Sequence, residues 1–154
     1  VFATPFTIST EAHKKAILAA DSTAEVYPMG CAKFVPLIEG EQFASEELPK
    51  AIAEYAAPLK AAGVDTLILS CTHYPFIKEQ IAAEFGPEVT IIDPAEATSE
   101  LAIAALDEAG LAKNEGVGRV TICGTADIDR VRRLAARMLP VAECEFKEIN
   151  LQEK

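Results

Sequence analysis

Short apolar runs alternate with amphipathic stretches along most of the chain. The apolar runs predict strands at residues 1–3, 24–28, 66–70, 89–92, 120–123 and 141–149. The amphipathic stretches predict helices over residues 11–20, 45–62, 77–85, 95–108 and 126–139. Strands that alternate with helices are typical of βαβ units, so we expect an α/β fold with an open parallel sheet and helices on both of its faces.

Residues of restricted conformation set several expected boundaries. Ser45 is expected to cap the helix that follows it, and Gly63 to close that helix. Residues 34–40 are apolar but contain Pro36, so they are expected to form a loop or a short turn of helix, after a loop over residues 29–32. Residues 111–118 are polar and contain glycine, which makes them the best candidate for a linker.

The run 66–70 has no charged residue and is followed directly by Cys71, Thr72 and His73. Uninterrupted apolar runs of this length are typical of strands that are buried on both faces of a parallel sheet. Pro75 prevents the strand from continuing. Ligands of open parallel sheets bind outside the carboxyl ends of the strands, so these three side chains are expected where a ligand would bind.

Composition narrows the possible functions. The chain has 154 residues, half of them hydrophobic, which suits one domain or one domain plus part of another, and its first residue is Val1, which suggests a fragment or a processed product. A net charge of −10 argues against nucleic-acid partners, and Arg130, Arg132 and Arg133 are interpreted as a solvated helix face. No apolar run approaches the roughly 20 residues of a membrane span, and no signal peptide is recognisable. Four cysteines without a C-x-x-C pair disfavour zinc and redox-pair sites and fit a reducing cytoplasm.

Cys71 is the strongest candidate for chemistry. His73 and the amino end of the helix after Pro75 would both favour a thiolate, which can act as a nucleophile or as a general base. Thr72 and the nearby backbone amides could hold a substrate carboxylate. The alternative is that Cys71 is a small buried apolar residue and His73 a hydrogen-bonded loop residue.

The other cysteines are weaker candidates. Cys31 follows a glycine in a predicted loop and could reach a site. Cys123 precedes Gly124-Thr125-Ala126-Asp127, a strand-to-helix turn that could bind an anion, although core packing is the favoured interpretation. Cys144 alternates with charged residues and is expected to be structural.

Three further polar residues remain open. His13 lies on a lysine-rich helix and is expected to be solvated. Asp93 ends a predicted strand and is expected to cap a helix, to contact a substrate, or both. Glu39 is either a turn carboxylate that faces water or a group that orients His73, and spacing alone does not separate these two roles.

The string Cys71-Thr72-His73-Tyr74-Pro75 resembles the second catalytic-cysteine motif of bacterial glutamate racemases. Three other stretches resemble family segments in the same order: Ala3-Thr4-Pro5 through Ser9, Phe34-Val35-Pro36-Leu37-Ile38-Glu39, and Gly124-Thr125-Ala126-Asp127. The resemblance therefore covers nearly the whole chain.

This resemblance implies a cofactor-independent racemase, with no metal, that interconverts L- and D-glutamate for peptidoglycan synthesis. Two cysteines of that family flank the α-carbon, and Cys71 matches one of them. Thr72 and His73 match substrate-contact positions, with His73 also assisting catalysis, and Glu39 matches a carboxylate near that histidine. Residues 1–94 would form the second lobe of a two-lobed fold, and residues 95–154 the segment that returns to the first lobe.

The family's first lobe, with its Asp-Ser pair and the other catalytic cysteine, has no counterpart in this sequence. His13 stands where the family often has tyrosine, and Asp93-Pro94 replaces a frequent Asp-Ser. Two alternatives therefore stay open: a one-cysteine relative such as a decarboxylase or another amino-acid racemase, and an inactive half-protein that binds a partner or itself. Glutamate is the expected small-molecule partner, with the missing lobe or a second copy as the expected protein partner.

Overall fold

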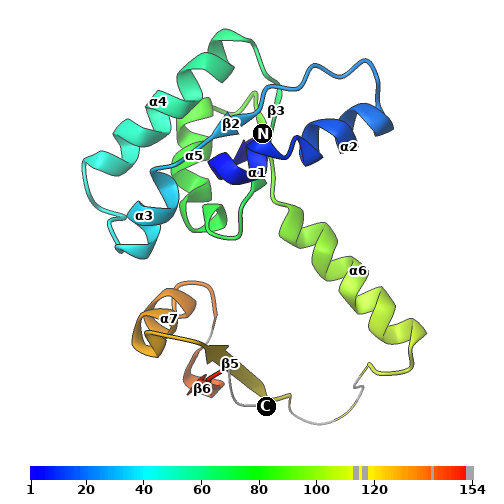
Figure 1. Cartoon of the computed structure of the whole chain (residues 1–154), viewed down its shortest axis with the longest axis vertical. Helices are drawn as coiled ribbons and strands as arrows, with labels where there is room; N and C mark the ends of the chain where they lie inside the picture. Colours follow the sequence, from blue (N-terminus) through cyan, green and yellow to red (C-terminus); the bar gives the residue numbers. More distant parts are fainter. Residues whose placement is uncertain (113–114, 116–117, 140, 152–154) are drawn as a thin grey trace. The chain divides into compact units, whose positions relative to one another are not determined.

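The computed structural model describes residues 1–112, 115, 118–139 and 141–151, and the chain forms two compact units, Val1–Ala104 and Ala105–Lys154. The first unit contains a parallel four-stranded sheet in the order β2-β1-β3-β4 (Figure 1). Its strands are β1 (Phe2–Ala3), β2 (Met29–Gly30), β3 (Thr66–Ser70) and β4 (Thr90–Ile92). Its helices are α1 (Pro5–Ser9), α2 (Ala12–Ala20), α3 (Phe34–Glu39), α4 (Glu47–Ala61), the 3₁₀-helix η1 (Tyr74–Ile77) and α5 (Lys78–Phe85).

Helix α6 (Pro94–Glu108) follows β4 and contains the boundary between the two units. The second unit holds a pair of parallel strands, β5 (Val120–Gly124) and β6 (Cys144–Glu148). Between them lie α7 (Ile128–Ala135) and the 3₁₀-helix η2 (Val141–Glu143). The expected α/β class with parallel strands is confirmed. Within the described ranges, no helix is both long and apolar enough to cross a membrane.

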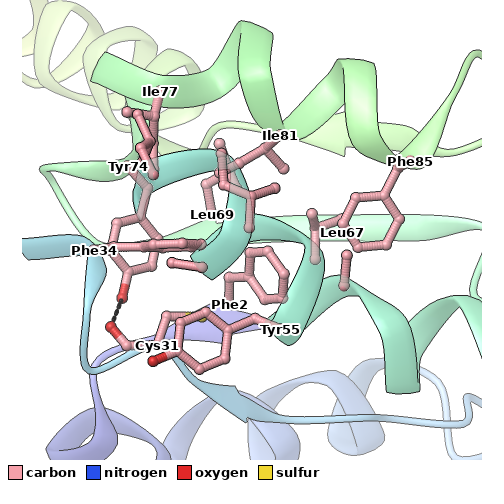
Figure 2. Packing of buried hydrophobic residues seen from close by; sticks show 14 of the residues in the cluster. Phe2, Cys31, Phe34, Tyr55, Leu67, Leu69, Tyr74, Ile77, Ile81 and Phe85 are labelled. Carbon is pink, nitrogen blue, oxygen red and sulfur yellow. Dashed lines mark hydrogen bonds between the residues drawn. The ribbon is translucent and has the colours of Figure 1, made fainter. Parts of the chain in front are cut away.

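The core of the first unit lies between one face of the sheet and helices α3, α4 and α5 (Figure 2). Leu67 and Leu69 of β3 point into it and are almost fully buried. Helix α4 buries one stripe with helical spacing, formed by Leu48, Ala51, Ile52, Tyr55, Ala56 and Leu59. Each large apolar side chain buried in this way contributes about 1.5–3 kcal/mol of transfer free energy.

The opposite face of the sheet is less covered than the sequence predicted. Thr66 of β3 is exposed and Ile68 is half-buried, although the apolar run predicted burial on both faces. Ile92 pairs with Ile68 and is 42% exposed. At β3, therefore, one face of the sheet is fully buried and the opposite face is only partly buried.

The structure changes the predicted secondary structure in two segments, residues 24–30 and residues 34–39. The strand predicted at residues 24–28 is wrong, because the strand is β2, in the segment that was predicted to be a loop. Pro28 has no N–H to donate, and pairing with β1 begins directly after it, where Met29 N donates to Val1 O at 2.8 Å. Residues 34–39 form a helix, the second of the two expected possibilities, since Pro36 stands in the first turn, where its missing N–H costs no hydrogen bond.

Helix ends differ by a few residues from the prediction. Ser45 does not cap α4, because its Oγ donates to Gln42 O at 2.8 Å and Glu46 stands at the cap position. Gly63 follows the end of α4 with a left-handed φ of 71°, as its predicted closing role requires. Helix α7 is shorter than predicted and begins after Asp127, whose carboxylate accepts from Arg130 N at 3.2 Å. In the predicted linker 111–118, residues 113–114 and 116–117 lie outside the described part of the chain.

Candidate active site

The carboxyl ends of the four parallel strands place four polar loops along one edge of the sheet. β1 is followed by Thr4, β2 by Cys31, β3 by Cys71 and β4 by Asp93. Ala3 pairs with Ser70, so Thr4 and Cys71 follow paired positions of neighbouring strands. This edge is where open parallel sheets bind ligands, and it contains the residues that the sequence singled out.

The residues Cys71, Thr72 and His73 form a short turn between β3 and η1. The backbone N–H of Tyr74 donates to Cys71 O at 3.1 Å, and that of Phe76 donates to His73 O at 3.1 Å. Cys71 is half-buried, Thr72 is exposed, and the His73 side chain is 28% exposed. All three side chains are therefore held by a hydrogen-bonded turn and remain accessible to a ligand.

The His73 ring connects the thiol to a carboxylate. Its Nε2 lies 2.9 Å from Glu39 Oε1, and its Nδ1 lies 4.0 Å from Cys71 Sγ and 3.5 Å from Thr72 Oγ1. An ionised carboxylate only accepts hydrogen bonds, so Nε2 carries the proton that is donated to Glu39. In the neutral ring, Nδ1 is then an acceptor that faces the Cys71 thiol and the Thr72 hydroxyl.

Glu39 reaches His73 because of the helical conformation of residues 34–39. It is the last residue of α3, and the buried Phe34 and Ile38 fix that helix against the core. The carboxylate is about one third exposed, so the contact with His73 lies at the rim of the site. The structure thus brings together Cys71, Thr72, His73 and Glu39, the four residues that the sequence proposed for the site.

Cys31 lies at the same edge but its thiol is not available. It is 1% exposed, and its Sγ lies 3.6 Å from Met29 O, to which it donates. Burial raises the pKa of the Cys31 thiol to about 12. A thiol that holds its proton so strongly cannot act as a base at neutral pH, so Cys31 is not a second catalytic thiol of this site.

The remaining sequence candidates lie elsewhere or have structural contacts. Asp93 Oδ1 accepts from Ala95 N at 3.0 Å, which is the helix-capping role among its two expected roles. Cys123 and Cys144 lie on β5 and β6 of the second unit. His13 lies on α2, half-buried instead of solvated as expected, and its Nδ1 has no hydrogen-bond partner among the residues that the structure describes.

Sequence reasoning missed two features of this edge. Thr4 Oγ1 lies 2.9 Å from Thr7 Oγ1 and caps α1 beside the end of β3. The buried Tyr74 hydroxyl donates to Cys31 O at 3.3 Å. A threonine directly after a strand and before a proline is a signal that could have identified Thr4, whereas the Tyr74 contact joins residues 43 positions apart and has no local signal.

A hollow of about 560 Å³ lies at the opposite end of the sheet. Its lining includes Val1, Asp65 and Thr66 at the amino ends of β1 and β3, together with Ile17 of α2 and Leu59 of α4. None of the four proposed site residues lines it. Because the chemistry-bearing side chains gather at the carboxyl edge, the candidate site is placed there.

Comparisons with known proteins identify relatives of this chain. The model of the family described as Asp/Glu/Hydantoin racemase matches residues 1–102. A glutamate racemase of Lysinibacillus sphaericus is 35% identical over 153 residues, which are 99% of this chain and 58% of that protein. A glutamate racemase of Carnobacterium is 43% identical over 102 residues, 66% of this chain and 38% of that protein.

Solved structures show the same relationship. The crystal structure of a glutamate racemase from Francisella tularensis in complex with D-glutamate matches 99% of this chain with a TM-score of 0.86 and 27% identity. The chain covers 57% of that structure. The chain thus spans 58% of the Lysinibacillus sphaericus protein and 57% of the Francisella tularensis structure.

Proposed function

The chain belongs to the Asp/Glu/Hydantoin racemase family, and from this premise we propose that it carries one of the two catalytic thiols of a glutamate racemase. Cys71 is that thiol, and glutamate is the substrate. The racemase would supply D-glutamate for peptidoglycan in the cytoplasm. The observation that carries the proposal is the sequence of contacts from Cys71 through His73 to Glu39 at the carboxyl edge of the sheet.

The proposed chemistry is proton exchange at the α-carbon. His73 Nδ1 accepts the Cys71 thiol proton and leaves a thiolate, and Glu39 holds the ring by accepting from Nε2. The thiolate takes the α-hydrogen as a proton, forming an S–H bond, while the C–H electron pair stays on the substrate and delocalises into its carboxylate. Thr72 and the backbone amides around it are proposed to bind that carboxylate, where donors stabilise the developing charge.

Inversion requires a second acid on the opposite face of the α-carbon, because Cys71 can protonate only the face from which it took the proton. Cys31 cannot supply this acid, since its thiol is 1% exposed and donates to Met29 O instead of facing a ligand. The relatives contain further sequence that this chain does not span. We therefore propose that this further sequence forms a first lobe, that the second acid comes from that lobe, and that residues 95–154 pack with it.

The test follows the α-proton of glutamate by NMR in heavy water, together with chiral analysis of the product. The chain is measured alone and with a separately produced first lobe of a relative. We expect racemisation only in the mixture, and we expect Cys71→Ser to reduce it by about 100-fold or more, the scale of a positioned acid–base group. Cys31→Ser, at the buried thiol that does not face the site, is the control and should leave the rate unchanged.

Two results would contradict the proposal. Rapid racemisation by the chain alone would show that no second lobe is needed. Exchange that converts no L-glutamate into D-glutamate in the mixture would instead indicate a one-thiol relative that acts on one face only.

A further inference from the structure

One short segment, Cys31–Glu39, contacts the catalytic turn at two successive residues. Glu39 accepts from His73, and the Cys31 carbonyl accepts from the Tyr74 hydroxyl at 3.3 Å. The Tyr74 ring also packs edge-on against Phe34 of the same segment, with ring centroids 5.2 Å apart. We propose that Tyr74 is a positioning residue, whose hydroxyl fixes the turn that carries Cys71 and His73 to the segment that carries Glu39. This inference rests on the proposed function of that turn.

The Tyr74–Cys31 bond joins two loops that the sheet itself does not join. β2 and β3 are not neighbours, because β1 lies between them. Ladder hydrogen bonds therefore cannot fix the loop after β2 to the loop after β3. The hydrogen bond from the Tyr74 hydroxyl to the Cys31 carbonyl, drawn as a dashed line in Figure 2, makes this connection.

Core packing alone does not require the Tyr74 hydroxyl. Tyr74 is completely buried, and a phenylalanine ring would fill the same apolar space. A buried hydroxyl costs free energy unless it is hydrogen-bonded, so its presence here is accounted for by the bond to Cys31. Burial also raises the pKa of Tyr74, so the hydroxyl remains a donor throughout the neutral range.

Because of its place in the chain, a shift of Tyr74 would affect the proposed chemistry. It follows His73 directly, and its own N–H donates to Cys71 O at 3.1 Å. A shift of the Tyr74 backbone would thus move both the thiol and the imidazole, whose separation is already 4.0 Å. Displacements of about 1 Å in reacting groups are large enough to cost about 100-fold in rate.

Tyr55 provides a closely matched control. Its ring packs edge-on against the same Phe34, also with centroids 5.2 Å apart, and it is 8% exposed. Its hydroxyl accepts from Lys33 N at 3.2 Å, so it too bonds to the backbone of the 31–39 segment. Tyr55 lies on α4, outside the catalytic turn. Tyr55→Phe and Tyr74→Phe therefore remove the same group from the same ring cluster, and only one of them releases the turn.

The first measurement uses the chain as it stands and needs no racemase activity. Amide hydrogen exchange is followed at Tyr74 and Phe76, the donors inside the turn, and at residues of β3 and α4 as internal references. In Tyr74→Phe the turn amides should exchange about tenfold faster relative to the references, the factor expected for one lost hydrogen bond. In Tyr55→Phe this ratio should stay within about twofold.

A second readout follows the His73 ring. The chain has two histidines, so selective ¹⁵N labelling gives one signal set for His73 and one for His13 as reference. The Nε2 proton donated to Glu39 should exchange with water faster in Tyr74→Phe and remain as in the parent chain in Tyr55→Phe.

The outcomes separate this proposal from the proposed function. Equal effects of the two substitutions on the turn amides and on the His73 ring would overturn it, since Tyr74 would then be an ordinary core residue. In a reconstituted racemase, Tyr74→Phe should lower kcat about tenfold with KM changed less than twofold, and an unchanged kcat would also overturn it. If no racemase activity can be reconstituted at all, the exchange measurements still decide the positioning role.

Discussion

At the scale of single residues, the site depends on a contact between Glu39 and His73, which lie 34 positions apart in the chain and 2.9 Å apart in space. Sequence spacing left two roles open for Glu39, as a solvated turn carboxylate or as a group that orients His73. The contact arises because residues 34–39 are helical, which the run of apolar residues around Pro36 did not establish. The proposed site residues were thus found by their chemical type and motif, whereas their distances required the fold.

The Glu39 contact leads to a prediction about the proposed proton exchange. Glu39→Gln keeps the size of the side chain, but its amide can donate as well as accept, so it no longer selects the ring form with the proton on Nε2. We expect the rate of α-proton exchange in the reconstituted enzyme to fall about 100-fold, at the lower end of what a positioned acid–base system contributes. The rate is measured by loss of the α-proton NMR signal in heavy water.

Glu79→Gln is the control for this prediction. Glu79 lies exposed in the first turn of α5, and the substitution removes the same charge without approaching His73. A similar loss of rate in both variants would indicate a general effect of net charge, and it would contradict the role of Glu39.

Cys31 gives a prediction about stability in alkaline solution. Burial raises its pKa to about 12, whereas an unfolded thiol titrates near 8.5. As the pH rises above that value, the unfolded chain releases the proton and the folded chain retains it, so the free energy of unfolding falls. Between pH 8 and 10 the Cys31 contribution to this fall is about 2 kcal/mol.

The measurement compares urea unfolding at pH 8 and 10 for the parent chain and for Cys31→Ala. The variant starts from a lower stability because it loses buried volume, but it should lose about 2 kcal/mol less over this pH interval. Cys123→Ala, at an exposed thiol, should lose as much as the parent. Parallel pH dependences of Cys31→Ala and the parent would show that the Cys31 thiol is not shielded from water.

At the scale of elements, the alternation of strands and helices was predictable, and most helices begin and end within a few residues of their predicted bounds. Helices such as α4 were predictable because their buried apolar residues recur with helical spacing in the sequence. The short edge strand β2 was not predictable, because two residues carry no periodicity and pairing with β1 alone defines it. The partial exposure of Ile68 and Ile92 was missed for the related reason that an apolar run does not reveal how much covers each face.

The end of α4 provides a test at this scale. Gly63 has a φ of 71°, and apart from its two chain neighbours a Cβ added there would meet no atom of the described residues within 4 Å. The only cost of Gly63→Ala is therefore the left-handed backbone conformation, about 1 kcal/mol, which lowers the Tm of the first unit by roughly 4–8 °C. Thermal unfolding followed by circular dichroism measures this shift.

Gly63→Asn distinguishes the backbone effect from crowding. Asparagine is larger than alanine but tolerates left-handed φ values, so it should destabilise the first unit less than alanine does. If the loss of stability increased with side-chain size instead, the space around Gly63 would be filled and the assigned cause would be wrong.

At the scale of the whole molecule, α6 has a surface that its surroundings in the described structure do not explain. None of its residues is buried, and Leu101, Ile103 and Leu106 are 73%, 60% and 47% exposed. Helical spacing distributes these apolar side chains, together with several alanines, around the helix, and the polar residues Glu96, Thr98, Ser99, Glu100, Asp107 and Glu108 lie between them. Large apolar side chains that are exposed together on one element are typical of a surface that packs against another protein body. The relatives contain additional sequence that could form such a body.

We therefore expect Leu101→Glu to impair assembly with a first lobe without unfolding the chain. A charge in place of the exposed Leu101 side chain would have to be desolvated on docking, which costs several kcal/mol unless it is paired. The affinity for a relative's first lobe, measured by calorimetry, should fall at least 30-fold, while the thermal unfolding of the chain alone should change by less than about 0.5 kcal/mol, as at other exposed sites. Glu100→Ala, which changes the neighbouring position without adding a charge, should leave the affinity unchanged. Equal binding by Leu101→Glu and the parent chain would exclude the Leu101 position of α6 from the docking surface, and the first lobe would then have to bind elsewhere on the chain.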